Sequence, residues 1–498
     1  MSLNRREVLA ATSVMAALSV GTTANAERRN RKGVRTLIKN GFLYTADANN
    51  TVIPDCWVLI EDDKIHSLGS AKDKKPKYDH VINARGKMIL PGFVNPHWHE
   101  SFVEGPDRAA PDDSDLERMP FSLGGDIEAL GSYFGVIADV GEKFRPEEAY
   151  AIARWSLWTQ LRSGTTAIGD IGSLNSTDAM AQAAIDLGMR IRVSRWGSDI
   201  MIPNGADKYK IIADTDKQTR DWDDLMKKWN NHASGLVGGM PSILACFGSS
   251  DAQLIGLRDV AKQYNSPYAA HLAPLKNEAA ALWPIFGRSA IGRFDHLGML
   301  TNRLLAVHTA YATPEEYQRI VETKVNICHS PANYGLLGEA TVSETGMIGR
   351  LIMEGHPVSC STDGNISYTG GMPEAMRYTH LGHNEAQNDN TACPPTTALA
   401  TGTRNGALAL GWADKIGSIE PGKQADIVLI DIDDWRYRLI THPLSVFLTA
   451  GGSKDVDTVI IAGKTLIKNG KSTTMSESKM LRDYTIAVET ARTRIFGA

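Results

Sequence analysis

Hydrophobic and polar positions along the middle of the chain fall into two alternating kinds of segment. Short apolar runs of strand length alternate with longer stretches that carry helix start and stop signals, such as Thr313-Pro314 followed by two acidic residues. Further helices are expected from Pro146 to Gly164 and from Thr177 to Gly188. The apolar runs predict strands at residues 88–95, 164–169, 190–196, 241–247, 267–272, 304–309, 324–329 and 357–362. Eight strands, each followed by helical material, predict an α/β fold with a (β/α)8 TIM-type barrel over residues 91–412.

The two ends of this middle region have a different pattern. Short β-type runs separated by Asn-Gly and Asp-Asp turn signals occupy residues 33–90, and residues 413–475 have a similar pattern of short β-type runs. We therefore expect one small β-sandwich domain formed from both chain ends, followed by a helical tail at 476–498. Residues 101–143 fit no regular element and are expected to cover the barrel mouth.

The first residues of the chain resemble a twin-arginine export signal. Arg5-Arg6 precede an apolar, Ala-rich run, and Ala24-Asn25-Ala26 offers small residues for cleavage. The pattern predicts removal of residues 1–26 and a periplasmic or secreted mature protein, with a short N-terminal helix as the alternative. The apolar run is too short to span a bilayer, and no other segment approaches about 18 consecutive apolar residues. No membrane span is expected.

The amino-acid composition excludes several classes of protein and of binding partner. The 498 residues are 22% charged and 42% hydrophobic, and the net charge is −4, which excludes a disordered or coiled-coil chain and offers no broad basic surface for nucleic acid. Five cysteines without a C-x-x-C spacing argue against a disulfide framework or a thiolate zinc site and suit free buried thiols. We expect a small-molecule substrate and leave open a homodimer or higher homo-oligomer.

Metal-capable side chains stand at the ends of four predicted strands. His97 and His99 end the first strand, and residues two apart on a strand point to the same side. His271 ends the fifth strand, His308 the sixth, and Asp363 the eighth. Because active sites of such barrels lie at the carboxyl ends of the strands, these N and O donors predict a site for one divalent ion, Zn²⁺ before Fe²⁺ or Mn²⁺.

The same residues carry a resemblance to the amidohydrolase superfamily, in the branch that holds guanine deaminase, S-adenosylhomocysteine deaminase and the s-triazine hydrolases. The matching motifs are 91–95 before the histidine pair, His271, His308, Asp363 within Ser-Thr-Asp-Gly, and 417–426.

The resemblance implies roles for these residues. His97, His99, His271 and Asp363 would bind the metal, and His308 would contact the metal or its water. Asp363 would also accept a proton from that water. The fourth strand, 241–248, lacks the Lys that bridges two metals in binuclear members, which favours a single ion.

One departure from the resemblance concerns proton delivery. Deaminating members carry Glu three residues after the strand-five histidine, where this chain has Pro274. Glu100 and Glu278 are the candidate replacements, each with a surface or loop-anchoring role as the alternative. We expect a hydrolase that uses a metal-activated water to cleave a C–N bond of a small cyclic or aromatic substrate. An amidase, lactamase or carbamate hydrolase is one alternative, and an exported metal-binding barrel without turnover is another.

Several aromatic and polar residues near strand ends are candidates for substrate contact. His380 and His383, three residues apart on a predicted helix, are expected to pack or face solvent rather than bind metal. The expected substrate-binding residues are Trp98, Tyr311, His329 and Asn333. Core packing is the alternative for Trp98 and Tyr311, and a structural role is the alternative for His329.

Overall fold

The computed structural model describes six stretches of the chain. Residues 1–32, which contain the predicted export signal, and 101–140, most of the predicted mouth cover, lie outside them, so both predictions stand as made. The described residues are 33–100, 141–172, 176–337, 341–364, 370–438 and 442–497.

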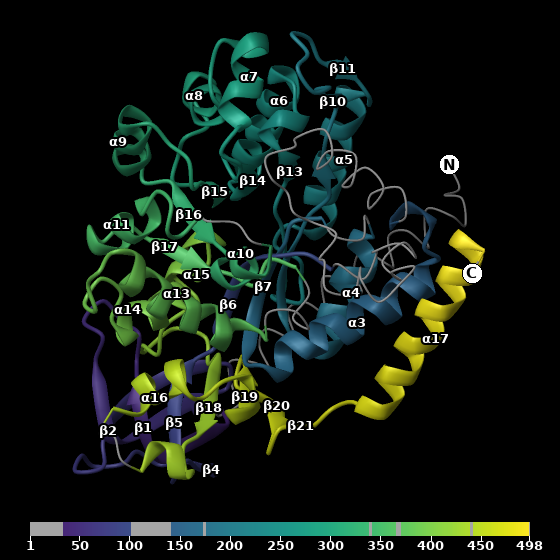
Figure 1. The fold of residues 1–498 in the computed structure, drawn as a ribbon. Coiled ribbons are helices and arrows are strands. Elements are labelled where there is room, and N and C mark those ends of the chain that lie inside the picture. The colour runs from purple at the N-terminus through teal and green to yellow at the C-terminus, as the bar shows by residue number, and fades with distance from the viewer. Residues whose placement is uncertain are drawn as a thin grey trace, which may run out of the picture.

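The barrel predicted for the middle of the chain is present, and it fills the centre of Figure 1. Its strands all run parallel, and its third and fourth strands are each interrupted by a short break. In chain order they are β6 (Phe93–Trp98), β7 (Thr165–Asp170), β8 (Arg190–Val193) with β9 (Trp196–Gly197), β12 (Val237–Gly239) with β13 (Ser242–Ala245), β14 (Tyr268–Leu272), β15 (Leu304–His308), β16 (Asn326–His329) and β17 (Val358–Cys360).

Two hydrogen-bonded sheets make up this ring of strands. One has the order β12-β8-β7-β6 and the other β17-β16-β15-β14-β13-β9, so they join where the third and fourth strands break. The ring closes on the other side through a parallel bridge between Trp98 and Asp363, where the His99 N–H donates to the Asp363 carbonyl over 3.2 Å. Closure therefore places the histidines of the first strand beside the aspartate that follows the last one.

Helices follow the strands as the sequence pattern predicts. Pro314 opens one of them, with a capping box between Thr313 and Glu316, and Gly188 ends another in the left-handed conformation with φ 76°. No helix among the described residues is long and apolar enough to cross a membrane. The helices around the barrel are α3 (Pro146–Arg162), α4 (Thr177–Leu187), α5 (Thr215–Trp229), α6 (Asp251–Gln263), α7 (Glu278–Phe286), α8 (Ala290–His296), α9 (Pro314–Thr323), α10 (Pro331–Leu337), α11 (Met347–Met353), α13 (Met372–Ala386), α14 (Pro395–Thr401) and α15 (Arg404–Ala409).

The five cysteines are all buried and free of disulfides, as expected.

Short elements complete the described chain. A two-stranded ribbon and three 3-10 turns are formed by β10 (Ile200–Met201), β11 (Lys210–Ile211), η2 (Cys246–Gly248), η3 (Trp435–Tyr437) and η4 (Ser453–Asp455).

The small domain combines strands from both ends of the chain, which lie side by side at the bottom of Figure 1. All nine belong to one continuous sheet with the order β21-β20-β19-β18-β5-β1-β2-β3, and β4 pairs with β1. One apolar cluster, which includes Ile60, Ile65, Ile427 and Ile460, unites the early and late strands. The strands are β1 (Arg35–Tyr44), β2 (Val52–Glu61), β3 (Lys64–Ser70), β4 (His80–Asn83), β5 (Lys87–Pro91), β18 (Ile427–Asp431), β19 (Val456–Ile461), β20 (Lys464–Lys468) and β21 (Lys471–Ser472).

One predicted strand proves to be two. The apolar run 88–95 was expected to be a single barrel strand, but it divides at Gly92 into β5, which pairs with β18 of the small domain, and β6 of the barrel. A Cβ at Gly92 would stand 2.2 Å from the Thr166 hydroxyl oxygen, so the turn needs glycine. A run of apolar residues indicates that a segment is buried, but it does not indicate in which of two sheets the segment lies.

Two further helices belong to the C-terminal part of the chain. They are α16 (Pro443–Thr449) and the predicted tail helix, α17 (Glu477–Phe496). Figure 1 shows α17 lying along α3 at the edge of the molecule. Arg154 on α3 binds Asp483 on α17 at 2.5 Å, and Arg494 binds Glu148, so two ion pairs hold the tail helix on α3.

A buried ion pair joins the barrel to the small domain. The Arg190 guanidinium of β8 donates to both carboxylate oxygens of Asp426, at 2.7 and 3.0 Å, and to the Gly235 carbonyl at 3.1 Å. The two side chains are 7% and 1% exposed. Because a buried charge is costly without its partner, this contact fixes how the two domains sit together.

We predict that breaking this pair destabilises the protein more than replacing it. Arg190→Met or Asp426→Leu alone should each lower the free energy of unfolding by about 3–5 kcal/mol, because one buried charge is left alone, while the double variant should lose less. Chemical denaturation would measure this. Arg319→Met, which removes an exposed cation, is the control; an equal loss in the control and the single variants would contradict the prediction.

Candidate metal centre

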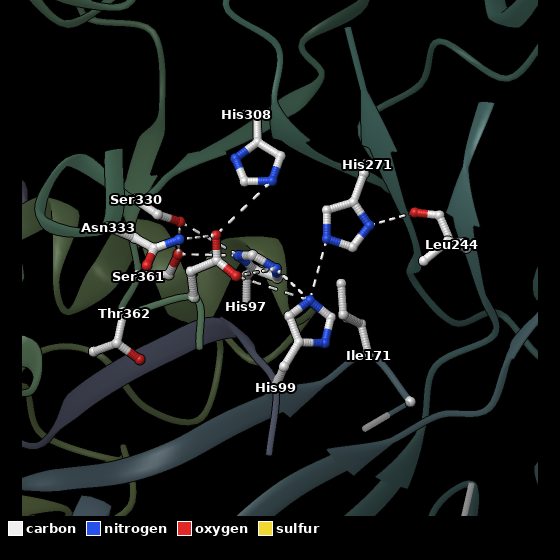
Figure 2. Close-up of polar contacts among 12 residues, drawn as sticks. His97, His99, Ile171, Leu244, His271, His308, Ser330, Asn333, Ser361 and Thr362 are labelled. Carbon is white, nitrogen blue, oxygen red and sulfur yellow. Dashed lines mark hydrogen bonds and ion pairs between the residues drawn. The ribbon is translucent and has the colours of Figure 1, made fainter. Parts of the chain in front are cut away.

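The metal-capable residues predicted from four strand ends meet at the carboxyl end of the barrel (Figure 2). His97 lies on β6 with His99 just after it, and His271 lies on β14. Their Nε2 atoms form a chain of close contacts, 2.9 Å from His97 to His99 and 3.2 Å from His99 to His271. His308 ends β15 and turns toward the same point in Figure 2. Asp363 follows β17, and its carboxylate lies 3.7 Å from His97 and 4.0 Å from His308.

The Asp363 carboxylate faces the imidazoles with its two oxygens in different directions. Its Oδ1 lies 3.7 Å from His97 Nε2 and 4.0 Å from His99 Nε2, and its Oδ2 lies 4.0 Å from His308 Nε2. The ligand atoms form two sets, and within each set all the atoms lie within 4.8 Å of one another. One set is His97 with His99 and His271, and the other is His97 with His308 and Asp363. His97 belongs to both sets, which links the five residues into one cluster of donors.

The hydrogen bonds behind the imidazoles fit a metal at that position. The Leu244 carbonyl can only accept, so His271 Nδ1 carries the proton and its Nε2 lone pair faces the centre. His97 Nδ1 similarly faces the hydroxyls of Ser361 and Ser330 at 3.3 and 3.4 Å. Nε2 lone pairs that converge at about 3 Å repel one another unless a proton or a cation lies between them. The donor set of imidazole nitrogens and a carboxylate suits Zn²⁺.

Burial keeps these imidazoles neutral, which is the form that binds metal. Desolvation and the neighbouring imidazoles hold the pKa of His97, His99 and His308 well below the ordinary value, and desolvation lowers the pKa of His271 to about 4. Desolvation also raises the pKa of Asp363 to about 7, against the lowering effect of hydrogen bonds from Asn333 and Gly364. The centre is thus short of positive charge, which a divalent ion would supply.

The backbone is in the left-handed region at several of these strand ends. φ is 70° at His308, 48° at Thr309 and 58° at Asp363, although none of them is glycine. Val307 belongs to an apolar cluster with Ala269 and Leu305, and regular alternation would turn His308 away from that side. The positive φ changes the direction of the chain and brings the imidazole to the centre. Such local strain is characteristic of functional sites.

Two residues of α10 contact the centre in a way that the sequence did not indicate. Asn333, predicted to touch substrate, donates from Nδ2 to Asp363 Oδ2 over 2.9 Å. Tyr334 Oη lies 2.8 Å from His308 Nδ1. The sequence signal was limited to polar and aromatic residues after the seventh strand, with no spacing that relates them to the sixth or the eighth.

The other predicted substrate contacts have different surroundings. Trp98 lies between the two histidines on the opposite side of β6 and is buried in the main core. Tyr311 is partly buried and donates to Glu344 over 3.0 Å. His329 is fully buried with both ring nitrogens in contact with protein, Nδ1 with the Ser359 carbonyl at 3.0 Å and Nε2 with His383 Nε2 at 2.8 Å. With both ring nitrogens engaged inside the protein, the surroundings of His329 are those of a structural residue, and its contact with a substrate stays a prediction.

His380 and His383 have the packing roles expected of them. His380 Nδ1 contacts the Cys393 carbonyl at 2.6 Å, and His383 is the buried partner of His329. Both lie on α13, and neither belongs to a set of converging metal-ligand atoms among the described residues.

The two candidate proton donors are both buried carboxyl groups. Glu100 directly follows His99 and is 1% exposed. Glu278 opens α7 and borders a cavity of about 250 Å³ that Ala273 and Tyr311 also line. Neither carboxylate oxygen of Glu278 has a hydrogen-bond partner in the described part of the chain, and desolvation raises its pKa to about 8 although Arg293 opposes the shift. This shift of the pKa favours the protonated form of Glu278 at neutral pH.

Comparison with known proteins gives close matches over most of the chain. A 5-methylthioadenosine/S-adenosylhomocysteine deaminase of Acetivibrio thermocellus is 26% identical over 450 residues, 89% of this chain and 96% of that relative. An adenosine deaminase of Xanthomonas campestris with bound zinc superposes with a TM-score of 0.78 at 24% identity, over 92% of this chain and 99% of the other.

A further solved structure has the same fold with different named chemistry. Atrazine chlorohydrolase of Arthrobacter aurescens, complexed with zinc, superposes with a TM-score of 0.79 at 21% identity, over 91% of this chain and 100% of the other. The sequence model of the Amidohydrolase family matches residues 88–466, which include the whole barrel and every residue of the metal centre. This chain is a member of the amidohydrolase family.

Proposed function

We propose that this protein is a mononuclear zinc hydrolase that acts on an aminated heterocycle outside the cytoplasm. The observation that carries the proposal is the convergence of two sets of ligand atoms that share His97, one with His99 and His271 and the other with His308 and Asp363. Family membership makes the chain a metal-dependent hydrolase of C–N bonds in small substrates. A single ion, its identity as Zn²⁺ and the substrate class are our additions.

The roles of the side chains follow from their positions. A divalent ion held by His97, His99, His271 and Asp363 would lower the pKa of a coordinated water from about 15.7 towards about 7. Asp363 Oδ2 faces away from His97 and His99, so it can accept a proton while Oδ1 faces the ligands. His308 Nε2 lies beside that same oxygen and can orient the attacking group. The burial of these groups excludes bulk water and strengthens each interaction.

Two substrate classes follow from different observations. The named activities of the relatives, deamination of adenosine-type nucleosides and dechlorination of a triazine, favour displacement at an electron-poor ring carbon. Pro274 favours a second candidate, hydrolysis of an amide, lactam or carbamate, because the shuttle carboxylate of the deaminases is missing there. A screen of the zinc-loaded protein against aminated purines and triazines, cyclic amides and aryl carbamates would decide. Zinc binding without turnover of any of them would favour a binding protein.

Proton delivery to the leaving group is assigned to Glu278, with Glu100 as the second candidate. Glu278 follows the strand that carries His271, and it retains its proton at neutral pH, as a general acid must. Pro274 cannot carry a proton, so another residue has to perform this step in a deaminase.

The histidine pair provides the first test. Replacing both His97 and His99 with Ala should reduce bound zinc from about one ion per chain to none and abolish turnover, because two of the ligands are lost. Metal analysis of the purified protein measures the first effect. The control is His66→Ala with His80→Ala, which removes two exposed imidazoles of the small domain. A full metal equivalent in the His97/His99 double variant would show that the site is misassigned.

The proton donor provides the second test. Glu278→Gln should lower kcat by roughly 10²–10⁴-fold with unchanged zinc content, because the amide cannot donate its proton in the same way. Glu100→Gln is measured alongside, and Glu374→Gln, which changes a partly buried carboxyl bonded to Ser453, is the control. Wild-type rates in both candidate variants would leave His308 and Asp363 as the remaining proton carriers.

The burial of Glu278 can be checked without substrate. Its pKa is about 8 in the folded chain and 4.5 ordinarily, so folding binds a proton between these values. The stability of the wild type relative to Glu278→Gln should therefore fall as pH rises from about 4.5 to about 8 and then level off. A pH-independent difference in unfolding free energy would mean that the carboxyl ionises normally.

Export provides a third test. Replacing Arg5 and Arg6 with Lys should leave the uncleaved precursor in the cytoplasm, because the arginine pair is the distinguishing feature of the signal. Cell fractionation and immunoblotting measure the location and length of the protein. The same change at Arg28 and Arg29, beyond the predicted cleavage site, is the control. Normal export of the Arg5/Arg6 variant would contradict the twin-arginine assignment.

A further inference from the structure

Two neighbouring residues of one short helix form hydrogen bonds with Asp363 and His308 of the metal centre. Asn333 and Tyr334 lie on α10, which directly follows β16. Asn333 donates to Asp363, and Tyr334 contacts His308. These are the two groups whose backbone lies in the left-handed region and whose side chains face each other across the centre.

The two carboxylate oxygens of Asp363 have different partners, and only one of them accepts a hydrogen bond from Asn333. Nδ2 of Asn333 lies 2.9 Å from Oδ2, while Oδ1 lies closest to His97 Nε2, at 3.7 Å. Rotation of the carboxylate about its Cβ–Cγ bond would break the bond to Asn333 in a site that is nearly closed to water. The orientation of the carboxylate plane is therefore fixed, with one oxygen toward the histidine ligands and the other toward Asn333 and His308.

The contact with Tyr334 fixes the orientation of His308. The phenol oxygen lies 2.8 Å from Nδ1, and the tyrosine is 2% exposed. A ring flip of His308 would place a carbon where Nδ1 now stands and would lose this bond. Nε2 is consequently directed toward Asp363 Oδ2 at 4.0 Å, while the His308 ring stacks on the His271 ring with their centroids 5.2 Å apart.

Backbone geometry alone does not fix either side chain. Rotation about Cα–Cβ and the following bond remains free after the chain has turned at His308 and Asp363. A hydrogen bond to a buried, rigid partner removes that freedom, as the outer contacts of metal ligands generally do. One helix supplies both partners, so a single packing interaction orients two functional groups from different strands.

We propose that Asn333 and Tyr334 are a pair of positioning residues that hold Asp363 and His308 in the arrangement needed for metal binding and proton transfer. The proposal rests on the proposed function, because it assigns these groups their roles at the metal. It gives Asn333 a different task from the substrate contact expected from the sequence. Neither residue needs to touch the substrate.

This role predicts a specific pattern of kinetic and binding effects. Tyr334→Phe removes one oxygen, and Asn333→Leu removes the amide with little change in volume. Each should weaken zinc affinity or lower kcat by about 10–100-fold, because the ligand or proton carrier is no longer oriented, while KM changes little. A substrate contact at Asn333 would instead raise KM.

The experiment compares these variants with matched controls. Tyr317→Phe removes another buried phenol oxygen, bonded to Glu354 at 2.6 Å, and Asn326→Leu removes another buried amide, bonded to the Asn302 carbonyl at 2.6 Å. Zinc affinity is measured by chelator competition, and ¹⁵N-histidine NMR reports the protonation and hydrogen bonding of His308 Nδ1. We expect Tyr334→Phe to shift the His308 signal and Tyr317→Phe to leave it unchanged. Near-UV circular dichroism confirms that each variant is folded.

The outcomes separate this inference from the proposed function. A wild-type protein that binds no zinc at His97, His99 and His271 would refute the proposed function itself. A wild type that binds zinc, with Tyr334→Phe and Asn333→Leu matching their controls in zinc affinity, kcat and the His308 signal, would refute the positioning role alone. An increase in KM alone for Asn333→Leu would also overturn it in favour of a substrate contact.

Discussion

Closure of the barrel is the constraint on which the functional centre depends. The bridge between Trp98 and Asp363 joins the first strand to the chain that follows the last one, and it is the only described backbone pairing between them. Because His97 and His99 flank Trp98, the same bridge sets their distance from the Asp363 carboxylate. A slip of one residue there would turn the histidines and the aspartate to opposite faces. Packing elsewhere in the barrel serves to hold this register.

The electrostatics of the centre explain why it needs an ion. Four imidazoles and one carboxyl group are brought together where water cannot solvate them, so desolvation lowers the histidine pKa values and raises that of Asp363. The assembled side chains present lone pairs to one another, and a divalent cation converts this repulsion into attraction. The arrangement is consistent with the zinc present in the structures of an adenosine deaminase and an atrazine chlorohydrolase of the same fold.

The departure at Pro274 concerns the proton path and leaves the metal ligands intact. His271 keeps its position and its bond to the Leu244 carbonyl, so the ligand set does not depend on the residue three positions later. Glu278, at the start of the next helix, has a raised pKa and no hydrogen-bond partner among the described residues, whereas the buried carboxylate of Asp426 is paired with Arg190. Its raised pKa and its place beside a cavity suit a proton donor.

The sequence by itself determined the barrel, the small domain from both chain ends and the residues that converge at the centre. These conclusions depend on local rules: strand and helix periodicity, and the placement of active-site residues at the carboxyl ends of parallel strands. Tertiary structure decided what local pattern cannot express. The split of one apolar run between two sheets at Gly92, the pairing of His329 with His383, and the contacts of Asn333 and Tyr334 each join segments that are distant in sequence. Such contacts depend on how helices and strands pack in three dimensions. The residue pattern within one helix or strand does not indicate which other element will pack against it.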